Sequence, residues 1–89
     1  MQYTDADFTY LKNELLRMLP HAEFNISRYD YGHGISVAWQ TMHTGVQRRY
    51  QVTLDPTNVT ESKYRDLEAL LNRAIYSYNN TIKYSEPSE

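Results

Sequence analysis

The middle of the chain alternates apolar and polar residues with a period of two, the pattern of strands that bury one face. Three runs show it and predict strands over residues 22–29, 34–42 and 46–54. In the corner at Asp30 to Gly34, Gly32 and Gly34 supply the positive φ angles that a reversal often needs, and His43-Thr-Gly45 forms the second corner. The sequence therefore predicts a three-stranded antiparallel meander.

Helical spacing of apolar residues flanks these strands on both sides. Thr4 or Asp5 can cap a first helix, which Pro20 stops at Leu19. A second helix begins after the cap residue Thr60 and ends at Asn79-Asn80. The apolar positions are Phe8, Leu11, Leu15, Met18 and Leu19 in the first helix and Tyr64, Leu67, Leu71, Ala74, Ile75 and Tyr78 in the second.

The expected fold is α+β with the order α-β-β-β-α. Both helices pack on one face of the sheet, because only one face of each strand is apolar. The other face stays open and polar. It carries Glu23, Asn25, Ser27, Tyr29, Ser36, Ala38, Gln40, Gln47, Arg49, Gln51 and Thr53. Arg48 lies on the nominally apolar side of the third strand, where we expect its stem to pack and its head to reach water.

The length of 89 residues allows one hydrophobic core, so we expect a single domain over residues 1–84 and a flexible polar tail over 85–89. There is no cysteine, which removes disulfides and thiolate metal sites and fits a reducing compartment. The sequence shows no secretory leader pattern and no apolar run long enough to span a bilayer. These features predict a cytoplasmic protein without a membrane partner.

The net charge of −2 does not indicate what kind of partner the protein binds. It is not the strongly basic charge of a nucleic-acid binder, nor the dense acidic charge of a DNA mimic. The unusual feature of the composition is its nine tyrosines. Tyrosine combines a large contact area with a polar tip and is enriched at protein interfaces. The composition is therefore compatible with a binding protein, although the same tyrosines can pack around a small core.

Candidate chemistry is sparse. The spacing of His21, His33 and His43 matches no metal-binding motif, and the last two lie at opposite ends of the second predicted strand. No serine lies in a nucleophile elbow, and Gly32-His-Gly34 lacks the third glycine of a dinucleotide-binding loop. We therefore expect no catalytic residues, no metal and no cofactor, and a protein that is not an enzyme.

The α-β-β-β-α order is also that of the double-stranded-RNA-binding domain. Members of that family hold phosphates with a lysine cluster at the start of the second helix, where this chain reads Thr60-Glu-Ser-Lys-Tyr-Arg-Asp66. One lysine and one arginine between two acids make a poor phosphate clamp. A small nucleic-acid-binding module remains the alternative hypothesis, with Arg28, Arg48 and Arg49 as cations and tyrosines as stacking groups.

Two stretches, Leu19-Pro-His-Ala-Glu-Phe-Asn-Ile-Ser27 and Gly34-Ile-Ser-Val-Ala-Trp39, with Tyr31 between them, resemble the signature of the large polyvalent protein-associated domain numbered 29. In that family a helix ends in Phe-Pro-Gly, a Lys-Phe-Ser-Val strand follows, and a Gly-x-Ser-Ile-x-Val-x-Trp strand comes after a tyrosine-containing loop. Tyr78-Asn-Asn-Thr-Ile-Lys-Tyr84 resembles its Asn-rich segment after the second helix. The resemblance covers most of residues 11–84. The chain departs from it at Leu19, which replaces Phe, in lacking Asp-Gly-Pro after Trp39, and in a shorter loop before Gly34.

The resemblance implies a phage or plasmid origin and supplies no catalytic residues. By analogy with anti-CRISPR and anti-restriction proteins, it implies a phage-type protein that inhibits a bacterial defence system such as CRISPR-Cas. Such a protein acts through protein–protein contact with a host protein or ribonucleoprotein complex. The residues expected to contact the partner are Tyr29, Tyr31, His33 and Arg49. The sequence leaves open whether the protein is a monomer or a homodimer formed through an exposed strand edge.

Overall fold

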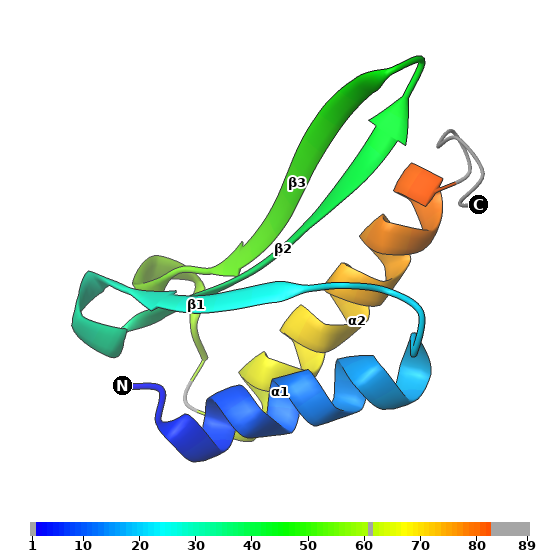
Figure 1. The fold of residues 1–89 in the computed structure, drawn as a ribbon. Coiled ribbons are helices and arrows are strands. Elements are labelled where there is room, and N and C mark those ends of the chain that lie inside the picture. Colours follow the sequence, from blue (N-terminus) through cyan, green and yellow to red (C-terminus); the bar gives the residue numbers. More distant parts are fainter. Residues whose placement is uncertain (1, 61, 83–89) are drawn as a thin grey trace.

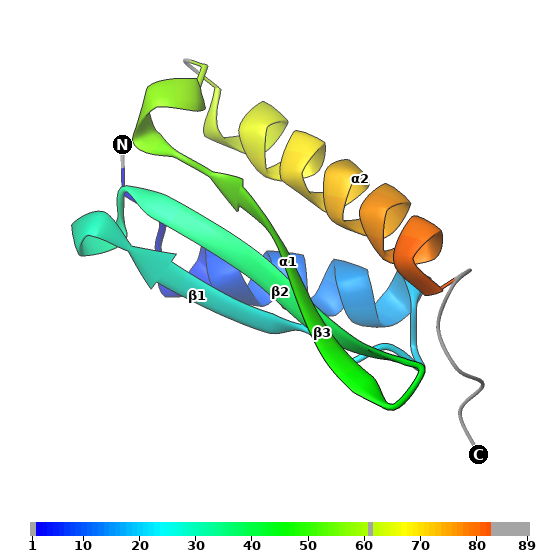
Figure 2. The same cartoon turned by 90° about the horizontal axis from the view of Figure 1, so that it is seen from above.

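A computed structural model describes residues 2–60 and 62–82. Its elements are α1 (Asp5–Met18), β1 (Asn25–Tyr29), the short 3-10 turn η1 (Asp30–Gly32), β2 (Gly34–His43), β3 (Val46–Leu54), a second 3-10 turn η2 (Pro56–Asn58) and α2 (Lys63–Ile82). The strands form an antiparallel sheet in the order β1-β2-β3, and both helices lie on the same side of it (Figures 1 and 2). The predicted α+β meander with two helices is confirmed. The expected tail over 85–89 lies outside the described residues.

The core forms between the apolar face of β2 and the two helices. Ile35, Val37 and Trp39 alternate along the central strand and are almost completely buried. Leu11 and Leu15 of α1 and, from α2, Leu67, Leu70, Leu71 and Ala74 complete the core from the other side. Burial of this apolar surface is the main force that holds the helices against the sheet.

Helix α1 begins with a capping box. The Thr4 hydroxyl accepts a hydrogen bond from the Asp7 amide, and the Asp7 carboxylate accepts one from the Thr4 amide. Two backbone donors that the first helical turn leaves unsatisfied are thereby paired. Of the two cap residues that the sequence allowed, Thr4 is the one used.

Helix α2 differs from its prediction at both ends. The side chain of Ser62 accepts a hydrogen bond from the Arg65 amide, whereas Thr60 bonds to Asp66. At the other end the helix continues through Asn79-Asn80 to Ile82, so the predicted stop is wrong. The last turn is held by Thr81, whose hydroxyl accepts a hydrogen bond from the Trp39 indole and donates one to the Tyr78 carbonyl.

The predicted apolar positions of the helices need three corrections. Leu70 is completely buried although it was not among them, while Tyr64 and Met18 are 62% and 48% exposed. The buried positions 67, 70, 71 and 74 also lie on one face of the helix, and this face is rotated from the predicted one toward Leu70. Tyr64 lies at the margin of the core, with its ring 5.7 Å from that of Tyr10.

Strand β1 is shorter than predicted, because it begins at Asn25 instead of residue 22. The Ala22 amide bonds to the Leu19 carbonyl, which keeps the chain close to the end of α1. Pairing with β2 begins only where Asn25 lies opposite Ala38. Strand β2 extends one residue further than predicted, to His43, and β3 has the predicted bounds.

The two corners of the meander use positive φ angles differently from the prediction. In the first corner Asp30, Tyr31 and Gly32 have them, whereas Gly34 does not. Gly34 is needed for space instead, because a Cβ there would overlap the ring of Tyr29. In the second corner Thr44 and Gly45 both have positive φ, as in the two-residue turn that suits the twist of a hairpin.

The β2–β3 hairpin is the longest projection of the fold. Its tip rises away from the end of α2 in Figure 1, and the molecule is correspondingly elongated, at 41 × 23 × 18 Å. The far half of the hairpin is largely exposed, from Val46 to Arg49. Neither described helix has the length and apolar character that crossing a bilayer requires.

Candidate functional site

The structure divides the four predicted contact residues between two ends of the sheet. Tyr29, Tyr31 and His33 lie together at the corner between β1 and β2. Arg49 lies opposite Gln40, six residues along β2 from the Gly34 that pairs with Tyr29, a separation of about 20 Å in an extended strand. The four residues therefore do not form one contact surface, although each end remains a candidate.

At the corner, Tyr29 and Tyr31 have different roles. Tyr31 is 91% exposed and adopts a left-handed backbone conformation. Tyr29 is half-buried over Gly34, and its hydroxyl donates a hydrogen bond to Asp55. Burial, together with this carboxylate, raises the pKa of Tyr29 to about 12. Tyr29 thus joins β1 to the end of β3, whereas Tyr31 presents its ring to solvent beside half-buried His33.

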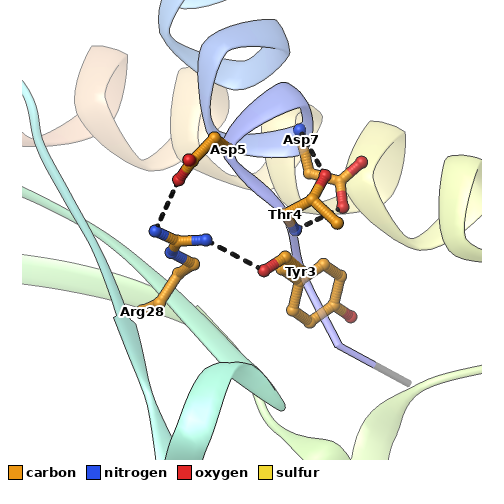
Figure 3. Close-up of polar contacts among 5 residues, drawn as sticks. All are labelled: Tyr3, Thr4, Asp5, Asp7 and Arg28. Atoms are coloured by element: carbon orange, nitrogen blue, oxygen red, sulfur yellow. Dashed lines mark hydrogen bonds and ion pairs between the residues drawn. The ribbon is translucent and has the colours of Figure 1, made fainter.

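At the end of the molecule that contains the helix N-termini, two cations, Arg28 and Lys63, have partners. Arg28 donates one hydrogen bond to the Tyr3 carbonyl at 3.1 Å and another to the Asp5 carboxylate at 2.7 Å (Figure 3). Lys63 of α2 lies 3.1 Å from the Asp7 carboxylate of α1. Burial opposes ionisation of Asp7, but hydrogen bonds from Thr4 and Lys63 outweigh it, and the pKa of the carboxyl is lowered. We name this region the paired end.

Two buried polar groups lie behind these pairs. Asp66, 4% exposed, accepts hydrogen bonds from the amide and the hydroxyl of Thr60, so it ties the chain before α2 to the helix. The hydroxyl of Tyr3 is buried without a hydrogen-bond partner among the described residues. Burial and the nearby carboxylates of Asp66 and Asp7 raise the pKa of Tyr3. These groups are part of the packing around the start of the two helices.

The far half of the β2–β3 hairpin differs in its charges. The sequence from Tyr31 to Leu54 contains no acidic residue, yet it includes Arg48 and Arg49. Neither guanidinium forms an ion pair or a side-chain hydrogen bond within the part of the chain that the structure describes. Because strand residues alternate in direction, Arg48 faces the helix side of the hairpin and Arg49 the open side. We name this region the arginine hairpin, residues 40–51.

The arginine hairpin borders an open hollow of about 380 Å³ against the last turn of α2. Tyr50 is one of its lining residues, and its ring stacks on that of Trp39 with 6.0 Å between ring centroids. The hydrogen bond from the Trp39 indole to Thr81 fixes this stack to the helix. The lining residues are Thr41, His43, Arg48, Tyr50, Asn80 and Thr81. Exposed Arg48 and the aromatic ring of Tyr50 therefore line the same hollow.

The other candidate groups, the histidines and the side chains with shifted pKa values, are not gathered at one place in the structure. His33 and His43 are at opposite ends of β2, and His21 follows α1. In residues 2–60 and 62–82 no three side chains of the metal-ligating types come together. The groups with shifted pKa values, Tyr3, Asp7, Tyr10 and Tyr29, do not converge on one hollow.

Arg48 is not among the four contact residues predicted from the sequence, although in the structure it lines the hollow beside Tyr50. The run without acidic residues is visible in the sequence, and it lies over both strands of the hairpin. This signal was available without a structure. Only the tertiary arrangement shows that the hairpin projects (Figure 1) and that the Arg48 guanidinium has no partner among the described residues.

Comparisons of this chain with known protein families, with curated proteins and with solved structures find no match. The resemblance to the large polyvalent protein-associated domain 29 therefore stays an expectation from the sequence.

Proposed function

We propose that this protein is a non-enzymatic binding protein that uses the arginine hairpin to contact a partner protein. The observation that carries the proposal is that Arg48 and Arg49 are left without partners among the described residues, on the part of the fold that projects furthest. Neither guanidinium forms a described ion pair or side-chain hydrogen bond within the fold, so both cations are available to a partner. A partner with a complementary charge would use them, because charged groups at an interface guide association and orientation.

The proposed target is a bacterial defence complex, and the protein acts as its inhibitor, as phage-type and anti-CRISPR proteins do. The resemblance described above supports this target. A projecting hairpin supports the mechanism, since a surface that is already folded as two paired strands loses little conformational entropy on binding and can occlude a functional site of the target.

The alternative is a small nucleic-acid-binding module. Arg48, Arg49 and the ring of Tyr50 support it, because proteins bind single-stranded nucleic acid through cations and stacking aromatic rings. Arg28, the third cation of that hypothesis, is engaged by Asp5 and the Tyr3 carbonyl. With two arginines that point to opposite sides of one strand, contact with successive phosphates is limited, and we favour a protein partner.

The test is capture of partners from bacterial lysate with tagged protein, with and without nuclease treatment, followed by mass spectrometry. We expect a defence complex that is retained after nuclease treatment and lost when Arg48 and Arg49 are both changed to Glu. Arg65→Glu is the matched control, because Arg65 is an exposed arginine in the first turn of α2, at the paired end. Retention of nucleic acid alone, with affinity that falls steeply with salt, would support the alternative.

A further inference from the structure

Strand β3 is an edge of the sheet, so one side of its backbone has no partner strand. The two-residue turn at Thr44 and Gly45 closes on the pair His43 and Val46. In such a hairpin the closing pair is hydrogen-bonded and the following pairs alternate. The residues at positions 47, 49, 51 and 53 therefore direct their N–H and C=O groups outward, to the free edge.

Arg73 of α2 provides independent evidence for this direction. Its guanidinium donates a hydrogen bond to the Thr53 carbonyl at 3.1 Å. A carbonyl that is directed at β2 could not be reached in this way from α2. The helix thus occupies the edge at Thr53, while exposed Gln47, Arg49 and Gln51 continue the edge toward the tip.

We propose that the free edge of β3 at Gln47, Arg49 and Gln51 binds an extended acidic segment of a partner protein, which adds to the sheet as a further strand. This inference rests on the proposed function, since it names the chemistry of the partner at the same surface. Strand addition uses main-chain hydrogen bonds for affinity and side-chain positions for selectivity. In the added strand, alternate side chains face the open side near Arg49 and the hollow near Arg48 and Tyr50.

Charge complementarity favours acidic side chains in this segment. An arginine donates two parallel hydrogen bonds to a carboxylate, and such pairs are stronger than neutral hydrogen bonds. The hairpin has two arginines and no acidic residue to compete with the segment. Tyr50 offers an aromatic surface for an apolar neighbour of the carboxylate facing Arg48.

A second copy of this chain is a poorer occupant of the edge. Symmetric pairing of two β3 strands around Arg49, the middle of the three exposed edge residues, sets this arginine opposite its own equivalent. Like charges directly opposite each other destabilise a strand pair. Charged side chains on an edge strand commonly prevent this kind of self-association.

The decisive variant is Gln51→Pro, with Gln51→Ala as its matched control. Proline removes the outward N–H without removing a hydrogen bond of the β2–β3 ladder, and edge strands tolerate it at such positions. Both variants lose the weak hydrogen bond between the Ser36 hydroxyl and the Gln51 side chain. A difference between them therefore reports on the free backbone edge. Circular dichroism and thermal unfolding establish that both variants fold.

The probe is a random-peptide display library, selected on the immobilised full chain. We expect the enriched peptides to carry acidic residues and to shift the backbone amide resonances of Gln47, Arg49 and Gln51. Their affinity should fall about ten- to hundredfold in Gln51→Pro, and by a similar factor when Arg48 and Arg49 are both changed to Glu, but little in Gln51→Ala or Arg65→Glu.

Several outcomes overturn the inference. Enriched peptides without acidic residues, equal binding to the proline and alanine variants, or an enrichment of no peptide at all would each contradict it. A dimer mass in light scattering that Gln51→Pro abolishes would assign the edge to a second copy. Salt-sensitive binding of single-stranded oligonucleotides that shifts the same amides would assign it to nucleic acid.

The two proposals can fail separately. If a defence complex is captured from lysate equally well by the Gln51→Pro variant, the proposed function stands and the edge site is wrong. If acidic peptides bind at the edge but no protein is captured, the site stands and the proposed target is wrong.

Discussion

The two ends of this molecule differ in how many of their cations have partners. At the paired end, Arg28 and Lys63 are satisfied by Asp5, the Tyr3 carbonyl and Asp7, and these contacts join α1 to β1 and α2. Exposed Arg65 is the exception there, because its guanidinium has no partner among the described residues. In the arginine hairpin, Arg48 and Arg49 have no partner among the described residues. The difference teaches that cations of one chain can serve the fold at one end and remain free for a partner at the other.

Trp39→Ala should produce the largest effect, because Trp39 fastens the hairpin to the rest of the fold. Its ring is 1% exposed, contacts Phe24, Tyr50 and Tyr78, and donates a hydrogen bond to Thr81. Loss of this core aromatic should lower the free energy of unfolding by about 3–5 kcal/mol. Urea denaturation measures it, with exposed Tyr31→Ala as a control that stays near wild type. A stable Trp39→Ala protein would show that the hairpin does not depend on this attachment.

Two glycine substitutions compare the ends directly. Gly34→Ala inserts a Cβ into the ring of Tyr29, which must move and give up its hydrogen bond to Asp55, at about 1–3 kcal/mol. Gly45→Ala at the hairpin tip meets no atom within 4 Å but retains a φ of +78°, at about 1 kcal/mol. Thermal unfolding of both variants measures the difference. Equal losses would contradict the role assigned to Tyr29.

The charges of the paired end should make its stability sensitive to acid. The folded-state pKa of Asp7 is below the ordinary value of 3.8, so its contribution is present above that pH and is lost as the pH falls through the lowered pKa. Asp7→Asn should cost about 1 kcal/mol at neutral pH and flatten the acid side of the stability curve. Chemical denaturation at several pH values measures this.

Asp5→Asn is the control for that experiment, since the Asp5 side chain is 93% exposed and its pair with Arg28 is at the surface. The expected change in stability is within about 0.5 kcal/mol. A steep acid dependence that persists in Asp7→Asn would assign it to another carboxyl.

The smallest effect on stability is expected in the arginine hairpin. Arg48→Ala and Arg49→Ala remove side chains without described partners, so the free energy of unfolding should stay within about 0.5 kcal/mol of wild type. Partner capture should nevertheless weaken in both. A loss of stability above that range would show that these arginines serve the fold, and the contrast between the two ends would disappear.

Much of the local structure could be predicted from the sequence. The alternation of Ile35, Val37 and Trp39 predicted the helix-facing side of β2, and the bounds of β3 were predicted correctly. Ser36 and Ala38, which the sequence placed on the open face, are buried as well, so that part of the prediction is wrong. Contacts distant in sequence caused the errors. The hydrogen bond from Trp39 to Thr81 accompanies a helix that runs past Asn79-Asn80, and the ring of Tyr29 gives Gly34 a steric role in place of a conformational one.

The candidate site shows the same limit. Tyr29, Tyr31 and His33 lie together because they are neighbours in the sequence, but Arg49 lies at the other end of the sheet. Their role as contact residues stays a prediction. Tyr29 is engaged by Asp55, a partner 26 residues away that no local pattern reveals.

The sequence by itself determined the order of the elements, the helix-facing side of β2 and the absence of acidic residues from 31 to 54, because hydrophobic period and charge are local properties of the chain. Only the tertiary structure decided which cations have partners, since an ion pair depends on distances between elements. It also decided that β3 is an edge whose backbone between Gln47 and Gln51 faces solvent, because strand order and the position of α2 arise from packing of the whole chain.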